Sequence, residues 1–323
     1  MDKPLLEIKN LKTYFFTKRG LVKAVDDVSF SVNEKETIGL VGESGCGKTI
    51  TALSLLRLVP EPAGRIVGGE ILLTGENLLQ KSENEMRKIR GRRVAIILQD
   101  PLTSLNPVYT IGDQVGEVIR LHQHIKGRAV LEKVIDALKR VRIPAAAERV
   151  RDYPHQMSGG MRQRVAGGIA ISCYPSVLIA DEPTTSLDVT TQAAYLRLLE
   201  QIQEETKAAM IFITHDLGIV AKACKKVCVM YMGKLVEMGK VREIWNNPRH
   251  PYTMALMKSI PHLEEKVKRL YSIQGQIPSH FDMPSGCVFH PRCDVADDRC
   301  RQEYPTSVNL GEGHVVSCWR VKD

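Results

Sequence analysis

Long hydrophobic runs are missing from this chain of 323 residues. No apolar stretch approaches the roughly 18–20 residues that a helix needs to cross a bilayer. The opening residues, MDKPLLEIKNLK, also lack the apolar stretch and the small-residue cleavage site of a signal peptide. We therefore expect a cytosolic globular protein, and we expect any contact with a membrane to run through a partner.

Acidic residues are outnumbered, since 45 Lys and Arg face 37 Asp and Glu and give a net charge of +8. Such an excess suits nucleic acid, anionic lipid or a nucleotide ligand. Aromatic residues make up only 5% of the chain, and none interleaves with the densest basic cluster, at 87–93. Binders of single-stranded nucleic acid use interleaved aromatic rings for stacking. The pattern favours a solvated or interface surface over a nucleic-acid site.

Four short apolar runs predict buried strands of a parallel sheet, because strands covered on both faces are continuously hydrophobic. They lie at 37–41, 94–98, 177–180 and 210–213. Between the last two, apolar residues at Tyr195, Leu198, Leu199 and Ile202 follow the spacing of a helix. The alternation indicates a doubly wound α/β core, and the stretches 6–9 and 25–32 indicate antiparallel strands.

Two changes in sequence texture divide the chain. From 101 to about 172 the strand signal fades, and periodic apolar positions such as Val130, Val134 and Leu138 predict an inserted helical subdomain. After Trp245 prolines are frequent and periodicity is weak. We expect a main domain over 1–245 and a small irregular C-terminal extension over 246–323.

One segment fits the phosphate-loop pattern G-x-x-x-x-G-K-S/T, between the strand 37–41 and a predicted helix at 52–58. Its glycines let backbone N–H groups surround phosphate oxygens at a helix N-terminus. Lys48 is expected to neutralise the β- and γ-phosphates, and the Thr49 hydroxyl to bind Mg²⁺. Cys46 is interpreted as a small loop filler, with a reactive thiol as the alternative. The expected nucleotide contacts are Gly42, Glu43, Ser44, Gly45, Cys46, Gly47, Lys48, Thr49 and Ile50.

Two further motifs complete a nucleotide-hydrolysing site. Asp181 and Glu182 follow the strand 177–180, which places Asp181 to hold Mg²⁺ and Glu182 to polarise water beside the γ-phosphate. Ser158-Gly159-Gly160 opens a predicted helix, where free N–H groups form an anion site. Because the chain already has a full phosphate loop, this second element suggests use by another subunit.

These motifs together resemble the ATP-binding subunit of an ABC (ATP-binding cassette) transporter over about residues 5–245. The resemblance implies a P-loop ABC ATPase core with an antiparallel β subdomain and an inserted helical subdomain. It also implies that two cassettes sandwich two ATP molecules, each between one subunit's Lys48 loop and the other's Ser158 helix. Met157 stands where the signature normally has leucine, a similar apolar volume. The order is the loop 42–49, Gln99, Ser158-Gly159-Gly160, Asp181-Glu182, Ser186-Leu187-Asp188 and His215.

The resemblance assigns roles to single residues. Gln99 resembles the glutamine that contacts Mg²⁺ or the attacking water and links the site to the membrane subunits. Asp188 resembles the aspartate that crosses the dimer interface, and His215 the switch histidine on the γ-phosphate. One aromatic residue of the run 14–16 should stack on adenine. Motif spacing favours Phe15, although three adjacent aromatics are also typical of a strand core.

The run 99–107, Gln-Asp-Pro-Leu-Thr-Ser-Leu-Asn-Pro, is similar to the one in dipeptide and oligopeptide importer ATPases. Segments 250–253, 275–278 and 284–293 resemble the C-terminal extension of the same subfamily. Nickel importers share much of this pattern and remain an alternative. A soluble ABC-type ATPase acting on DNA or ribosomes, or one with a metal- or redox-sensing tail, is a more distant one.

The resemblance also implies the partners and the location. They are a second ATP-binding subunit, identical or different, two integral membrane permease subunits and, indirectly, an extracytoplasmic solute-binding protein. No nucleic acid is expected. The protein would work on the cytoplasmic face of the membrane as a peripheral subunit.

Four cysteines, Cys287, Cys293, Cys300 and Cys318, crowd into the extension. Four thiolates can hold a 4Fe–4S cluster or a tetrahedral zinc ion. The closely spaced cysteine pair of structural zinc sites is absent, and some relatives with this extension are associated with an iron–sulfur cluster. We therefore expect a metal-binding extension that carries a 4Fe–4S cluster, with Zn²⁺ or unligated thiols as alternatives. His290 and His314 are candidate substitute ligands.

Overall fold

The computed structural model describes residues 3–100, 104–185, 187–260 and 271–321. Residues 101–103, at the predicted start of the helical subdomain, and Ser186 of the Ser-Leu-Asp motif lie outside the described residues. Contacts within the chain define two compact units, which are described separately. Unit 1 comprises Met1–Leu5, Val32–Glu36 and Gln80–Phe212, and unit 2 comprises Leu6–Ser31, Thr37–Leu79 and Ile213–Asp323.

A parallel sheet forms the core of unit 1. Its strands are β6 (Val94–Ile97), β7 (Val177–Asp181) and β8 (Ala209–Ile213, whose last residue belongs to unit 2), in the order β8-β7-β6. Strand β6 pairs in parallel with β7, with Val94 opposite Val177. Every residue of β7 and β8 is buried, as the continuous apolar runs predict. The predicted strand 94–98 ends one residue early, since Leu98 is 40% exposed.

Helices make up most of the rest of unit 1, including the region predicted to be helical. Helices α4, α5 and α7 pack against one another through buried side chains such as Val115, Leu138 and Val165. The described helices of this unit are α2 (Glu83–Ile89), α4 (Ile111–Gln123), α5 (Arg128–Arg140), α6 (Ala146–Arg149), the 3₁₀ turn η2 (Pro154–Gln156), α7 (Gly159–Ile171) and α8 (Val189–Thr206). The described residues of the segment predicted to be helical thus carry α4, α5, α6 and α7.

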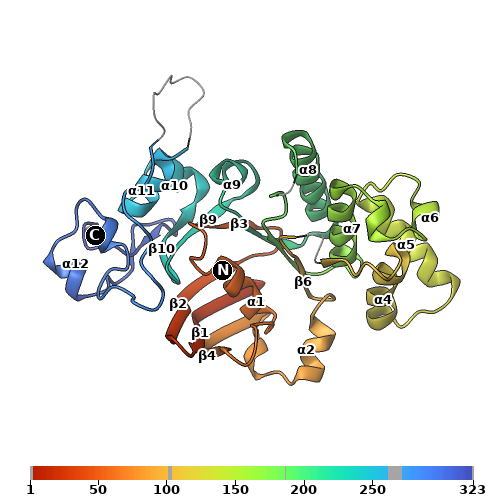
Figure 1. The fold of residues 1–323 in the computed structure, drawn as a ribbon, viewed down its shortest axis with the longest axis horizontal. Coiled ribbons are helices and arrows are strands. Elements are labelled where there is room, and N and C mark those ends of the chain that lie inside the picture. The colour runs from red at the N-terminus through yellow and green to blue at the C-terminus, as the bar shows by residue number, and fades with distance from the viewer. Residues whose placement is uncertain (1–2, 101–103, 186, 261–270, 322–323) are drawn as a thin grey trace. The chain divides into compact units, whose positions relative to one another are not determined.

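Unit 2 contains an antiparallel sheet built from β1 (Leu6–Thr17), β2 (Gly20–Val32), β4 (Gly64–Leu73) and β5 (Glu76–Asn77), in the order β2-β1-β4-β5 (Figure 1). The register of β1 on β4 runs from Leu6 opposite Leu73 to Phe15 opposite Gly64. Leu6 and Ile8 are buried, as the alternating pattern predicts, and Leu11 is buried beyond an irregularity in the register. A 3₁₀ turn, η1 (Leu78–Gln80), follows β5.

A further run of strands in unit 2 is hydrogen-bonded in the order β11-β12-β10-β9-β3. Its strands are β3 (Thr37–Val41), β9 (Lys226–Tyr231), β10 (Lys234–Lys240), β11 (Val308–Asn309) and β12 (Val315–Val316). Strands β3 and β9 are parallel, whereas β12 adds to β10 in antiparallel register. The C-terminal extension therefore supplies the outer strands of this run. Helices α1 (Lys48–Leu55), α9 (Leu217–Ala223), α10 (Val241–Asn246), α11 (Pro251–Lys258), η3 (His290–Arg292) and α12 (Asp298–Gln302) complete the unit.

A buried carboxylate fastens the extension to β10. The side chain of Glu237 is fully buried and accepts hydrogen bonds from the backbone N–H groups of Arg249, at 2.8 Å, and His250, at 2.9 Å. Its Oε1 also lies 2.8 Å from Nε2 of His314. These bonds join β10 to the start of α11 and to the segment just before β12. The extension is thus more regular than its sequence texture predicts.

Among the helices that the structure describes, none is long and apolar enough to span a bilayer.

Candidate nucleotide site

The loop from Gly42 to Gly47 has a backbone that only glycine accepts at key points. Gly42 and Gly47 have φ values of 151° and 106°, in the left-handed region that L side chains avoid. A β-carbon on Gly42 would lie 2.1 Å from the carbonyl oxygen of Met230, and one on Gly47 2.2 Å from that of Ala24. The predicted glycine pattern is therefore required by close backbone approach, and α1 begins directly after it at Lys48.

Lys48 lies inside this loop. Its side chain is buried, and Nζ donates hydrogen bonds to the carbonyl oxygens of Gly42, at 2.8 Å, and Glu43, at 3.1 Å. The next residue, Thr49, is exposed at the first turn of α1. A buried ammonium within a concave loop, next to an exposed hydroxyl at a helix N-terminus, suits a phosphate with its metal ion.

Cys46 fills the base of the loop. It is buried, and a β-carbon on Gly42 would lie 2.7 Å from its Sγ. Burial raises the pKa of the Cys46 thiol, although Lys48 opposes this shift. The thiol is therefore neutral near pH 7, which agrees with a loop filler rather than a reactive cysteine.

In unit 1 the structure joins two predicted site residues that are far apart in sequence. Glu182 accepts hydrogen bonds from Nε2 of Gln99, at 2.8 Å, and from Oγ1 of Thr185, at 3.0 Å. The preceding residue, Asp181, is the buried last residue of β7. Glu182 has a φ of 44°, a conformation that costs a non-glycine residue about 1–3 kcal/mol and is concentrated at functional sites. The strained turn directs the Glu182 carboxylate to Gln99.

The Ser158-Gly159-Gly160 segment also lies in unit 1, at the exposed start of α7. The Ser158 side chain caps the helix by accepting the N–H of Met161 at 3.3 Å. Both Ser158 and Gly159 are exposed, and a β-carbon on Gly159 would meet no atom within 4 Å. Gly160 packs closer, since its β-carbon would lie 3.1 Å from Thr191. An exposed, capped N-terminus of a 13-residue helix can receive an anion from outside the chain.

Asp188 lies after β7, at the start of α8, and His215 lies just after β8. Asp188 is the N-cap of α8 and accepts from the N–H and Oγ1 of Thr191, at 3.0 and 2.7 Å. These hydrogen bonds lower the pKa of the Asp188 carboxyl. His215 is exposed just after β8, and the next residue, Asp216, caps α9. Asp188 therefore has a local capping role that the sequence motif did not predict.

The aromatic run at the end of β1 divides between two faces. Phe15 is half-buried, and its ring packs on β4, where a β-carbon on Gly64 would lie 2.8 Å away. Tyr14 donates to Asp26 at 2.6 Å, and Phe16 is 51% exposed. The role of Phe15 in adenine stacking stays a prediction.

Sequence reasoning missed three side chains that hold the loop from the C-terminal extension. Arg292 makes a two-pronged ion pair with Glu43, with N···O distances of 2.6 and 3.1 Å. The N–H of Glu43 donates to the hydroxyl of Tyr252 at 2.8 Å. Nε2 of His280 lies 3.0 Å from the carbonyl oxygen of Gly45. These residues are more than 200 positions from the loop, so no local sequence motif predicts their contacts with it.

The four extension cysteines line one cavity of about 10 Å³, room for about one water molecule. Burial raises the pKa of the Cys287 thiol to about 11, and the neighbouring thiols raise it further. His290 lines the same cavity, whereas His314 bonds Glu237. Within the described ranges, no group of three His, Cys, Asp or Glu side chains is placed to hold a metal ion. A metal in the extension stays a prediction.

Comparison with known proteins agrees with these features. The model of the family "ABC transporter" matches residues 25–185. The chain is 46% identical to a probable peptide ABC transporter ATP-binding protein of Sinorhizobium fredii, with 98% of this chain and 95% of that one covered. An oligopeptide transport ATP-binding protein, AppD of Bacillus subtilis, is 44% identical over 98% of this chain and 96% of its own. The chain belongs to the ABC transporter ATPases.

A second family model, "Oligopeptide/dipeptide transporter, C-terminal region", matches residues 236–300. It places the chain among the members of the family that carry this region. The solved dimeric structure of the ATP-binding cassette MJ0796 bound to ADP and Pi has the same fold, with a TM-score of 0.66 at 22% identity over 73% of this chain and 99% of that one. The cassette cbiO1 of Clostridium perfringens gives a TM-score of 0.64 at 24% identity, over 76% and 92%.

Proposed function

We propose that this ATPase powers a membrane importer of dipeptides or oligopeptides from the cytoplasmic face of the membrane. The observation that carries the ATPase half is the glycine-built loop that holds Lys48 on its own carbonyl oxygens. The peptide half is supported by the C-terminal region match and by the names of the relatives, which concern peptides rather than nickel. A nickel importer is the alternative within the same subfamily.

In this proposal each motif has its own part in binding and hydrolysing ATP. The loop 42–49, with Ile50 after it, binds the triphosphate, and Lys48 leaves its carbonyl partners for the β- and γ-phosphates. Thr49, Asp181 and Gln99 would hold Mg²⁺, which neutralises charge on the phosphates when bound. Glu182 orients the attacking water and accepts its proton, and His215 donates to the γ-phosphate. The Ser158 helix binds the nucleotide of a second cassette.

The partners follow from this arrangement. An exposed anion site at the start of α7 needs a second ATP-binding subunit, identical or different, to bring a nucleotide to it. Two integral membrane permease subunits would take up the movement of the dimer, and a solute-binding protein would deliver the peptide to them. Copurification of this chain with membrane proteins would support this assembly. Copurification with nucleic acid would support a soluble ATPase acting on DNA or ribosomes.

Replacing Glu182 by Gln tests the hydrolytic assignment. The variant keeps the size of the side chain and an oxygen for Gln99 and Thr185, but it cannot accept a proton. We expect ATP turnover to fall about a hundredfold or more while ATP binding persists, and we expect a closed, ATP-loaded dimer on size-exclusion chromatography. Glu204→Gln, on the exposed face of α8, is the matched control. Wild-type turnover by Glu182→Gln would refute the role.

The cysteine cavity supports a further proposal, that the extension carries a 4Fe–4S cluster. Four cysteine thiols that line one cavity, with His290 beside them, offer the sulfur donors that such a cluster needs. Among the described residues no set of three such side chains is placed to hold a metal ion, whether a single zinc ion or the irons of a cluster. The cavity has to widen and the thiols have to lose protons. Metal and labile-sulfide analysis of anaerobically purified protein tests this; zinc, or no metal, would overturn it.

A further inference from the structure

An ion pair links the phosphate loop to the C-terminal extension of unit 2. The guanidinium of Arg292 meets both oxygens of Glu43, and the Arg292 side chain is only 4% exposed. Nη1 of Arg292 also donates to the hydroxyl of Tyr231 at 3.3 Å. A two-pronged contact of this kind fixes both side chains in orientation as well as in distance. Glu43 is therefore held in one position by a residue 249 positions away.

The charge of Glu43 gives this contact a function. Glu43 is the second residue of the phosphate loop, so the loop proposed to surround a triphosphate itself carries a negative charge. Like charges repel more strongly where solvent screening is weak, and the Glu43 side chain is only 24% exposed. A guanidinium bound to both carboxylate oxygens cancels that repulsion. It also leaves the Glu43 N–H on Tyr252 and its carbonyl oxygen on Lys48.

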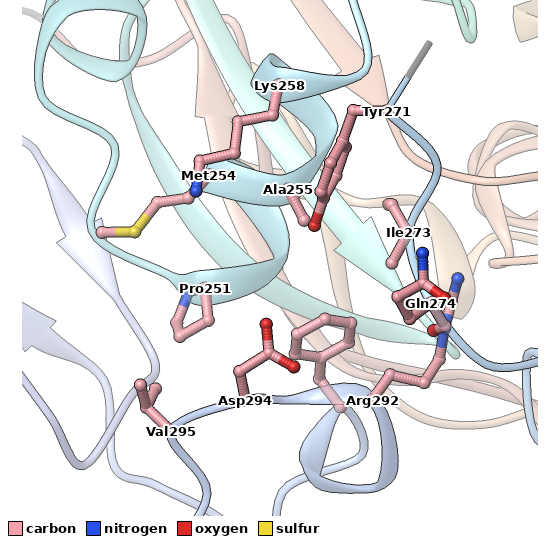
Figure 2. A pocket seen from close by; sticks show the side chains of 11 residues that line it. Pro251, Met254, Ala255, Lys258, Tyr271, Ile273, Gln274, Arg292, Asp294 and Val295 are labelled. Carbon is pink, nitrogen blue, oxygen red and sulfur yellow. The ribbon is translucent and has the colours of Figure 1, made fainter. Parts of the chain in front are cut away.

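Other contacts within the chain also hold Arg292 in place. Its Nε donates to the carbonyl oxygen of Gln274 at 3.1 Å, and its guanidinium lies 6.0 Å from the centre of the Phe289 ring. Figure 2 shows Arg292 beside Gln274 at the edge of a cavity of about 170 Å³, which α11 lines from the other side. Arg292 ends the turn η3 and precedes Cys293, so the segment that delivers it also lines the cysteine cavity.

We propose that Arg292 is a positioning residue of the ATP site, which neutralises Glu43 and holds the phosphate loop ready for a triphosphate. This inference rests on the proposed assignment of residues 42–49 as the ATP phosphate loop. It makes the C-terminal extension part of the nucleotide site of its own chain. A change in the extension that moves Arg292 should therefore change ATP affinity.

The direction in which two substitutions change ATP affinity separates charge neutralisation from a purely structural role of Arg292. Arg292→Met removes the guanidinium and leaves the Glu43 carboxylate uncompensated, so we expect ATP to bind about tenfold or more weakly, with a smaller loss for ADP, which carries less charge. Glu43→Gln removes the repelling charge, so we expect ATP affinity to stay at the wild-type level or rise. In the double variant Glu43→Gln/Arg292→Met, affinity should return to within about threefold of wild type.

The measurement is the equilibrium affinity for a fluorescent ATP analogue and its ADP counterpart, on the full chain at two salt concentrations. Arg301→Met, an exposed arginine of α12, is the matched control. Higher salt should reduce the defect of Arg292→Met. The inference is overturned if Arg292→Met binds ATP as wild type does, if Glu43→Gln weakens binding as much as Arg292→Met, or if the double variant shows no recovery.

Two further variants cover the case in which Arg292→Met does not fold and test the proposed function separately. If Arg292→Met fails to fold, Glu43→Gln and Arg292→Lys decide. A lysine keeps the charge but loses the two-pronged contact, so we expect Arg292→Lys to bind ATP somewhat more weakly than wild type, by less than about tenfold. Weaker binding by Glu43→Gln than by Arg292→Lys would then overturn the inference. Lys48→Ala tests the proposed function itself. Retained ATP binding in Lys48→Ala would refute the phosphate-loop assignment, whereas loss in Lys48→Ala with normal binding in Arg292→Met would refute only the role of Arg292.

Discussion

Removing the Glu237 carboxylate should loosen the C-terminal extension from the sheet of unit 2. Glu237 is fully buried and accepts from two backbone N–H groups and from the His314 imidazole. Glu237→Ala leaves all three donors without their acceptor in a buried place. Each buried donor left without an acceptor costs about 1–3 kcal/mol, so the total loss should reach about 3 kcal/mol or more. Glu237→Gln keeps a carbonyl acceptor and should cost about 1–3 kcal/mol.

Urea unfolding followed by tryptophan fluorescence measures this loss. The chain has two tryptophans, and both Trp245 and Trp319 belong to unit 2, so the signal reports on the unit that contains Glu237. Glu312→Ala is the matched control, since it removes a carboxylate of the same extension whose partner, Lys240, is exposed. That control should change the free energy of unfolding by less than about 0.5 kcal/mol. A loss below about 1 kcal/mol in Glu237→Ala would refute the fastening role.

Two further predictions concern the loop and α11. In Gly47→Ala the added β-carbon meets the Ala24 carbonyl at 2.2 Å, so the loop must shift; we expect ATP affinity to fall at least about tenfold, and unchanged affinity in a binding titration would show that the loop tolerates a side chain. His250 is wholly buried, which lowers its pKa to about 3. Because the unfolded histidine binds a proton near pH 6.5, the stability of unit 2 is full above that pH and falls as the pH drops toward 3. Between pH 7 and pH 5 wild type should lose about 2 kcal/mol more than His250→Asn, which keeps an N-cap oxygen; equal losses in urea unfolding at the two pH values would contradict this.

Residues that act through local pattern were predictable from the sequence. The buried strand that ends at Asp181 is a continuous apolar run followed by two acids, so strand, turn and site residue share one short segment. The glycines of the phosphate loop are likewise visible, because backbone geometry alone excludes other residues there. Such features need no knowledge of distant packing.

Residues that act through packing were not predictable. The pairing of Arg292 with Glu43 depends on where the extension folds back, and an arginine in a proline-rich stretch is more often a solvated one. The strands β11 and β12 are two residues each, too short to show a periodic pattern. The sequence predicts that Gln99 and Glu182 both act on the attacking water, but it does not predict the hydrogen bond between them. That bond depends on a left-handed backbone conformation at Glu182, which a glutamate rarely adopts.

The order of β10 and β12 in the chain has a consequence for protein synthesis. Strand β10 ends at Lys240, whereas its neighbour β12 starts only at Val315. During translation the backbone edge of β10 therefore stays bare while the whole extension is made, and a bare edge invites pairing with another chain. Chains that stop before β12 should therefore aggregate through the exposed edge of β10.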